Sequence, residues 1–248
     1  MIEVRDLKKN FSGHPVLDGV SFQIEAGESV VIIGRSGGGK SVLLKLIIAL
    51  IQPDSGAVFI NGTDIVGLTE RQLIQVRSQF GMVFQGAALF DSMTVAENVA
   101  FPLQRNGRHT QSETTRLVAR TLDVVGLHGT EHKKPAELSG GMRKRVGLAR
   151  AIIYEPKILL YDEPTTGLDP IVSDSIDNLM IRVRETLKVT SVVVTHDMRS
   201  ARRVGQRILM LNDGRIHAGG TPDEIFNSTD PVVRQFIDGV ADPEDILF

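Results

Sequence analysis

The residues with the clearest chemistry form a glycine-rich run that ends in a lysine and a serine. Residues 34–41 read GRSGGGKS, which fits the pattern G-x-x-x-x-G-K-[ST] between an apolar run and a helix-like run. Glycines here let backbone N–H groups surround an anion, while Lys40 can reach the outer phosphates and the Ser41 hydroxyl can bind Mg²⁺. The pattern predicts a phosphate-binding loop, and the alternative is a glycine-rich turn without a ligand.

Two carboxylates follow an apolar run further along the chain. Residues 158–161 read ILLY, and Asp162 and Glu163 come directly after them. Because open α/β sheets bind ligands at the carboxyl ends of their strands, Asp162 is placed to hold Mg²⁺ directly or through water. Glu163 could polarise an attacking water as a general base. Buried strands also end in acids at ordinary turns, but beside a phosphate loop these acids are its expected partners.

A second candidate anion site lies between these two motifs. Residues 138–142 read LSGGM and precede a basic, apolar-backed helical pattern over 143–154. A serine followed by two glycines forms a helix N-terminus suited to an anion. One nucleotide does not need two such sites in one chain, so the pattern indicates a nucleotide shared between two chains.

These motifs require a framework of strands and helices. Up to Gln85 the pattern predicts strands at 2–7, 16–25, 29–33, 57–60 and 81–84, interrupted by one helix over 40–51. Helical patterns follow at 112–125 and 140–154, and then strands at 158–161, 191–195 and 207–211 alternate with helices near 171–187 and 198–204. Such alternation predicts a parallel sheet with helices on both faces and a helical block inserted between its halves.

Composition excludes several classes of protein. The 28 basic and 30 acidic residues give a formal charge of −2, which argues against a protein that binds nucleic acid through its bulk charge. The absence of cysteine excludes disulfides, thiolate zinc sites and thiol catalysis. The longest apolar run, 46–51, is far shorter than the ~18 residues of a membrane helix, and no secretory signal is expected at the start.

With these motifs in this order, the sequence resembles the ATP-binding cassette (ABC) ATPases over nearly its whole length. The resemblance implies an α/β fold: a P-loop NTPase core of parallel sheet flanked by helices, with an antiparallel β-subdomain and a helical subdomain. It implies one domain over 1–248, with the core at about 1–87 and 156–228, the helical subdomain at 88–155 and a C-terminal tail at 229–248.

The resemblance also implies that the ligands are ATP and Mg²⁺. Gln85 matches the family's glutamine loop, which senses Mg²⁺ and water, and His196 matches the switch histidine that contacts the γ-phosphate and positions Glu163. Phe11 falls where the family places an aromatic ring on adenine, and the alternative is that a Phe near the first strand is a core residue. The metal ligands would be Ser41, Gln85 and Asp162. The nucleotide-binding residues would be Phe11, Gly34, Arg35, Ser36, Gly37, Gly38, Gly39, Lys40, Ser41, Val42, Ser139, Gly140, Gly141 and Asp169.

In this family a signature motif, which residues 138–142 match here, closes in one protomer over the nucleotide held by another. The resemblance therefore implies a head-to-tail dimer of this chain, in which Asp169 of the GLDP sequence faces the partner. Asp169 can also be read as the cap of a helix that Pro170 opens, and both readings can be true together. Met142 departs from the commonest signature, which has glutamine there, but the phosphate contacts come from Ser139 and backbone N–H groups. We expect closure over ATP to survive this change.

A narrower resemblance concerns the transported substrate. Residues 85–99, the signature with Met142 and residues 233–239 resemble the ATPases of Mla-type phospholipid transporters that work with MCE-type proteins. This implies a peripheral subunit on the cytoplasmic face of the inner membrane, with separate permease subunits, possible MCE-type and small accessory partners, and no nucleic acid. The alternatives are the ATPase of a polar-solute importer, such as one for amino acids, or a soluble ABC protein outside transport.

Two further expectations concern the surface and the end of the chain. The basic run 143–145 and the pairs at 133–134 and 202–203 are interpreted as solvated faces. Residues 231–239 predict a short amphipathic helix stopped by Gly239, followed by an acidic spacer and the apolar residues Ile246, Leu247 and Phe248. Either this end frays, or it docks on a neighbouring protomer or an accessory subunit.

Overall fold

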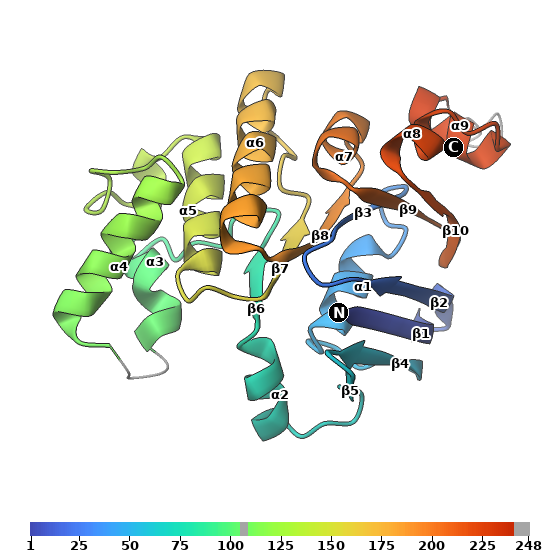
Figure 1. Cartoon of the computed structure of the whole chain (residues 1–248), viewed down its shortest axis with the longest axis horizontal. Coiled ribbons are helices and arrows are strands. Elements are labelled where there is room, and N and C mark those ends of the chain that lie inside the picture. Colours follow the sequence, from blue (N-terminus) through green and yellow to red (C-terminus); the bar gives the residue numbers. More distant parts are fainter. Residues whose placement is uncertain (105–108, 241–248) are drawn as a thin grey trace. The chain divides into compact units, whose positions relative to one another are not determined.

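The computed structural model describes residues 1–104 and 109–240 (Figure 1). The chain divides into two compact units, and each is described by itself. The first unit consists of Met1–Leu73 and Val193–Phe248, and the second of Ile74–Val192. Both contain strands and helices, and strands β3 with β9 and β6 with β7 pair in parallel, which confirms the predicted α/β class.

The first unit contains an antiparallel sheet with the strand order β2-β1-β4-β5. Its strands are β1 (Ile2–Phe11), β2 (His14–Ile24), β4 (Ser55–Ile60) and β5 (Thr63–Asp64). Ile2 lies opposite both Ile24 and Ile60, so one face of the sheet buries aliphatic side chains. This sheet confirms the expected antiparallel β-subdomain and presents the hairpin between β1 and β2.

The first unit also contains the strand that leads to the phosphate loop. β3 (Ser29–Ile33) is buried along its whole length and pairs in parallel with β9 (Arg207–Asn212), which pairs in antiparallel fashion with β10 (Arg215–Gly220). An uninterrupted aliphatic run suits a strand covered on both faces. The helices of this unit are α1 (Lys40–Ile47), α7 (Met198–Val204), α8 (Pro222–Phe226) and α9 (Pro231–Asp238).

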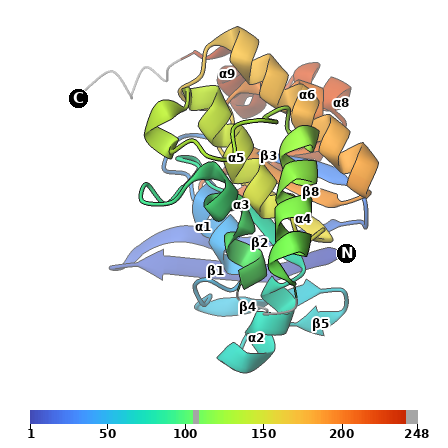
Figure 2. The same cartoon turned by 90° about the vertical axis from the view of Figure 1, so that its left-hand side faces the viewer.

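The second unit places helices beside the parallel strands β6 (Phe80–Val83) and β7 (Ile158–Asp162). Its helices are α3 (Val95–Gln104), α4 (Gln111–Val124), the 3₁₀ turn η1 (Pro135–Glu137), α5 (Gly140–Ile152) and α6 (Pro170–Leu187). α5 contacts α3, α4, α6 and β6, and Figure 2 shows α3, α4 and α5 grouped together. α5, which follows its cap Ser139, therefore packs against three other helices and one strand of this unit.

The chain passes between the units along α2 (Glu70–Arg77) and β8 (Thr190–Thr195). The prediction of only one helix before Gln85 was wrong, because α2 is a second one. Its sequence is polar, with Leu73 and Val76 buried and Ile74 exposed, so its apolar pattern is too short to indicate a helix.

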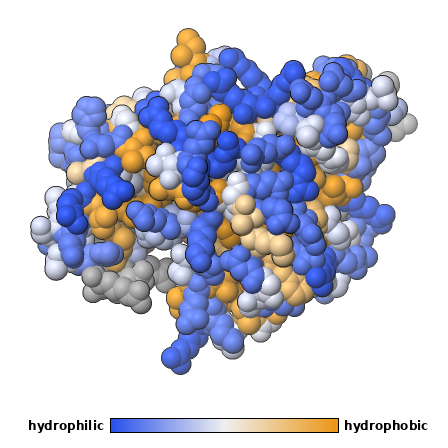
Figure 3. Space-filling view, in the orientation of Figure 1, coloured by the Kyte–Doolittle hydropathy of each residue, from blue (hydrophilic) through white to orange (hydrophobic). Residues whose placement is uncertain are grey.

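The hydropathy view shows mostly hydrophilic side chains with smaller hydrophobic patches (Figure 3).

At the C-terminal end, the predicted amphipathic helix is present as α9. Asp230 caps its start, Val233 is buried, and Gly239 ends it in a left-handed conformation with φ 66°. Residues 241–248, with the apolar triplet and the predicted docking of the tail, lie outside the described residues. In the described parts of the chain, no helix is long and apolar enough to cross a membrane.

Candidate active site

The phosphate loop of the first unit connects β3 to α1 in a backbone shape that requires glycine. Gly39 caps α1 with φ 91°, and no side chain caps the helix there. A Cβ at Gly34, whose φ is 156°, would lie 2.3 Å from the carbonyl oxygen of Leu211. The first turn of a helix presents N–H groups and a positive partial charge, so this end of α1 is suited to an anion.

Lys40 lies across this loop with only 6% of its surface exposed. Its Nζ donates to the carbonyl oxygens of Gly34, at 2.8 Å, and Arg35, at 3.0 Å. The ammonium group is therefore held within the loop at the N-terminus of α1. Ser41 follows it in the first turn, and both residues sit where the sequence pattern predicts phosphate and Mg²⁺ binding.

The first unit also carries the predicted adenine contact and the predicted switch histidine. The Phe11 side chain ends β1 and is 45% exposed, with the Lys9 ammonium 5.5 Å from its ring centroid. Its interpretation as a core residue is therefore wrong, while stacking on adenine stays a prediction. His196 follows β8 and is exposed, directly before Asp197, which caps α7.

In the second unit, the two carboxylates end a fully buried strand. Asp162 and Glu163 are each 8% exposed. Glu163 has a left-handed backbone with φ 50°, and its carboxylate accepts a hydrogen bond from Thr166 Oγ1 at 2.9 Å. Bends of this kind are costly for residues other than glycine and are frequent at active sites, where they direct a side chain.

The donor chemistry of the predicted metal ligands fits Mg²⁺. Ser41, Gln85 and Asp162 offer hydroxyl, amide and carboxylate oxygens, which are the hard ligands that this ion prefers. Among the described residues there is no cluster of three or more His, Cys, Asp or Glu side chains that would hold a metal by itself.

Gln85 opens a tightly supported loop. It lies two residues after β6 and is exposed, and the following Ala87 and Ala88 have left-handed φ angles of 61° and 47°. The Arg150 guanidinium donates to the carbonyl oxygens of these two alanines at 2.7 Å each. The backbone of the loop is therefore anchored to the C-terminal part of α5.

The signature serine caps α5. Ser139 Oγ accepts a hydrogen bond from the Met142 N–H at 3.3 Å. A Cβ at Gly141 would lie 2.6 Å from Val172 Cγ1, so this glycine allows the start of α5 to approach α6. The interpretation of Asp169 as a helix cap is confirmed, because its carboxylate accepts from the N–H groups of Ile171 and Val172 at 3.0 Å each.

The interpretation of the basic run 143–145 as a solvated face is wrong for Lys144. This lysine is 7% exposed, and its Nζ donates to the carbonyl oxygens of Gln85 and Glu163. Lys144 is the residue that joins the two predicted catalytic segments of the second unit, and sequence reasoning missed it. The available signal was its position on the apolar face of the helical pattern, in register with Gly141 and Leu148.

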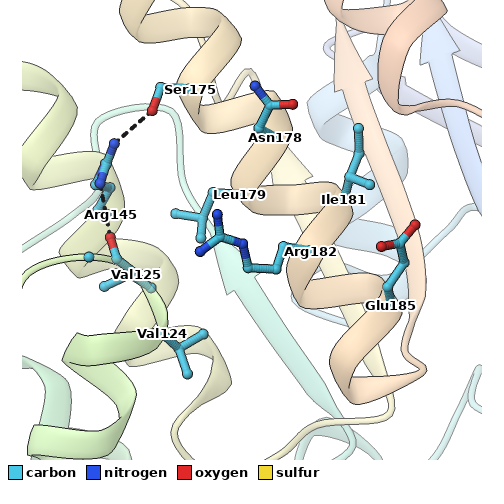
Figure 4. A pocket seen from close by; sticks show the side chains of 10 residues that line it. Val124, Val125, Arg145, Ser175, Asn178, Leu179, Ile181, Arg182 and Glu185 are labelled. Carbon is cyan, nitrogen blue, oxygen red and sulfur yellow. Dashed lines mark hydrogen bonds between the residues drawn. The ribbon is translucent and has the colours of Figure 1, made fainter.

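Arg145, next along α5, has a supporting role. Its guanidinium donates to the carbonyl oxygen of Val125 at 3.1 Å and to Ser175 Oγ at 2.7 Å. These bonds lie at a hollow bordered by the end of α4 and by α6, where Figure 4 shows both hydrogen bonds. Arg145 thus ties α5 to the end of α4 and to α6.

Comparison with known proteins places these motifs in context. Residues 17–166 match the family model described as ABC transporter. A probable ribonucleotide transport ATP-binding protein, mkl, of Mycobacterium leprae is 42% identical over 96% of this chain and 69% of its own length. The methionine import ATP-binding protein MetN of Carboxydothermus hydrogenoformans is 39% identical over 100% of this chain and 75% of its own.

A phospholipid transporter subunit and a solved dimer are also similar. The intermembrane phospholipid transport system ATP-binding protein MlaF of Haemophilus influenzae is 37% identical over 98% of this chain and 92% of its own length. The dimeric, post-hydrolysis structure of the ATP-binding cassette MJ0796 with ADP and Pi superposes with a TM-score of 0.83 at 33% identity. The match covers 90% of this chain and 99% of the MJ0796 chain.

Proposed function

This chain belongs to the ABC transporter family as an ATP-hydrolysing subunit, and from that premise we propose that it energises the movement of phospholipids across a cell envelope. The phosphate loop 34–41 would hold ATP, with Lys40 and the N-terminus of α1 against the phosphates. Bound Mg²⁺ would neutralise charge on the phosphates, with Ser41, Gln85 and Asp162 as its protein ligands.

Hydrolysis is assigned to Glu163. This residue is buried, it follows the fully buried strand β7, and its carboxylate accepts a hydrogen bond from Thr166 that restricts its orientation. In this role it would polarise the attacking water as a general base, and His196 would contact the γ-phosphate. Phe11 would stack on adenine from the hairpin of the first unit.

We propose that this chain forms a dimer with a second copy of itself. The MJ0796 cassette is a dimer in its post-hydrolysis structure, and the capped, glycine-lined start of α5 here is suited to a phosphate from another protomer. Separate permease subunits would bind the dimer at the cytoplasmic face of the inner membrane, together with an MCE-type protein and a small accessory subunit.

The lipid assignment is carried by residues 85–99 and Met142, which resemble the ATPases of phospholipid transporters, and by the similarity to MlaF along 98% of this chain. The similarity to MetN favours a second candidate, import of a polar solute such as an amino acid. The nucleotide motifs are common to both classes, so the transported molecule must be identified on the assembled transporter.

The test is to purify the full chain with its membrane partners in mild detergent and to analyse the bound lipids and proteins by mass spectrometry. ATPase activity of the same complex is then measured with added phospholipid or with added methionine. We expect retained phospholipid, an MCE-type protein and stimulation by phospholipid. A soluble solute-binding protein together with stimulation by methionine would establish the polar-solute importer instead.

A further inference from the structure

Lys144 connects two segments of the second unit that have different predicted roles. It lies five residues after Ser139, and its Nζ donates both to the carbonyl oxygen of Gln85 and, at 3.3 Å, to that of Glu163. These carbonyls lie just beyond the carboxyl ends of β6 and β7, which pair in parallel. One ammonium group therefore bridges the glutamine loop and the segment that carries the proposed general base.

Burying the ammonium group of a lysine at this position costs free energy. Burial lowers the pKa of Lys144 below its usual range, and the nearby carboxylates of Glu163 and Asp162 oppose this effect. An apolar side chain of similar volume would avoid the cost of removing an ammonium group from water. Such an apolar side chain could not donate hydrogen bonds to two backbone carbonyls.

Both segments that α5 supports contain left-handed, non-glycine residues. Glu163 has φ 50°, and Ala87 and Ala88 have φ 61° and 47°. Such conformations persist only where the surroundings hold them. Arg150 holds the two alanines, and the Glu163 carbonyl accepts from Lys144 and, at 3.4 Å, from the Thr166 N–H. One helix thus stabilises the bends at both segments.

We propose that Lys144 is a positioning residue for ATP hydrolysis, which holds the Glu163 backbone against the glutamine loop and so directs the Glu163 carboxylate. This proposal rests on the roles assigned above to Gln85 and Glu163. It makes α5 the connection through which movement of the glutamine loop reaches the carboxylate. Lys144 itself acts through Glu163 and needs no contact with ATP.

The test uses the purified full chain and four substitutions. Lys144→Met removes the donors with little change in side-chain length, and Lys144→Arg retains donors. Glu163→Gln removes the proposed base and is combined with Lys144→Met in a double variant. Lys157→Met is the matched control, because Lys157 is an exposed lysine just before β7 in the same unit. Single-turnover hydrolysis, ATP affinity and the unfolding midpoint are measured for each.

We expect Lys144→Met to reduce the hydrolysis rate at least ~10-fold, because misplacing a catalytic group by about 1 Å can cost ~10²-fold. ATP affinity should change less than ~3-fold, since the phosphate loop is untouched, and Lys144→Arg should recover most of the rate. In the Glu163→Gln background, Lys144→Met should change the residual rate by less than ~2-fold, because coupled residues are not additive.

Three results would overturn the proposal: a Lys144→Met rate within twofold of the control, a loss of ATP affinity equal to the loss of rate, or a full additional loss in the double variant. If Lys144→Met does not fold, Lys144→Arg decides alone, and a folded Arg variant with less than a tenth of the wild-type rate rejects the proposal. Normal hydrolysis by Glu163→Gln would instead reject the proposed role of Glu163.

Discussion

At the level of single residues, two buried lysines and a half-buried arginine donate hydrogen bonds to backbone carbonyls of loops. Lys40 donates to Gly34 and Arg35, Lys144 donates to Gln85 and Glu163, and Arg150 donates to Ala87 and Ala88. The printed acceptors of all three side chains are carbonyl oxygens of the backbone. For Lys40, these bonds place the ammonium group within the loop that is proposed to hold phosphates.

Lys40→Ala is expected to weaken ATP binding at least ~10-fold, because the ammonium acts on the phosphates of bound ATP as well as on the transition state. Binding and hydrolysis should fall together. Calorimetric titration with ATP measures the affinity, and Lys45→Ala, which changes an exposed lysine on the same helix, is the control. Unchanged affinity in Lys40→Ala would contradict the assignment of the phosphate loop.

At the scale of elements, close packing at the start of α5 explains the second glycine of the signature. The Cβ that Gly141→Ala adds would lie 2.6 Å from Val172 Cγ1, on a stiff β-branched side chain of α6. Overpacking of this kind typically costs about 1–3 kcal/mol. We therefore expect Gly141→Ala to lower the free energy of unfolding by that amount.

Urea unfolding monitored by circular dichroism measures this change, and Gly86→Ala is the control, because a Cβ at Gly86 would have no atom within 4 Å. Equal stability of the two variants would show that α5 and α6 can separate without cost. In that case the glycine would be explained by ligand binding alone.

Most elements that position the site could be predicted from the sequence. The buried strand Ser29–Ile33 and the helix Met198–Val204 have the predicted bounds, because an uninterrupted aliphatic run and an aspartate cap are strong local signals. The helix predicted over 40–51 ends four residues early, at Ile47, because the chain turns into a left-handed bend at Ala49. Such a bend leaves no mark in the apolar pattern.

Side-chain roles that depend on tertiary contacts could not be predicted. Asn98 is fully buried, and its amide group bonds to the backbone of Phe90, Met93 and Thr94, yet its sequence context indicates only a helical residue. Lys144 was assigned to a solvated face because a run of basic residues usually is one. In both cases the partners are backbone groups at least four residues away, and hydropathy carries no information about them.

For the whole molecule, we propose that two copies of the chain are needed for one complete site. Ser139→Arg would introduce a bulky cation at the start of α5, where the partner's nucleotide is proposed to bind. We expect ATP affinity of the isolated protomer to be unchanged, while hydrolysis falls at least ~10-fold and the ATP-dependent dimer is lost. Normal hydrolysis by this variant would mean that the site is not shared.

The proposal that Glu163 is the general base of a site shared by two protomers is tested most directly on Glu163→Gln. Sedimentation with ATP and Mg²⁺ and the rate of hydrolysis are measured for this variant. The amide keeps the shape of the carboxylate but cannot accept a proton, so ATP should remain bound and unhydrolysed. We expect an ATP-bound dimer and a rate reduced ~10²–10⁴-fold, the contribution typical of a positioned base. A monomer that hydrolyses ATP within about tenfold of the wild-type rate would contradict it.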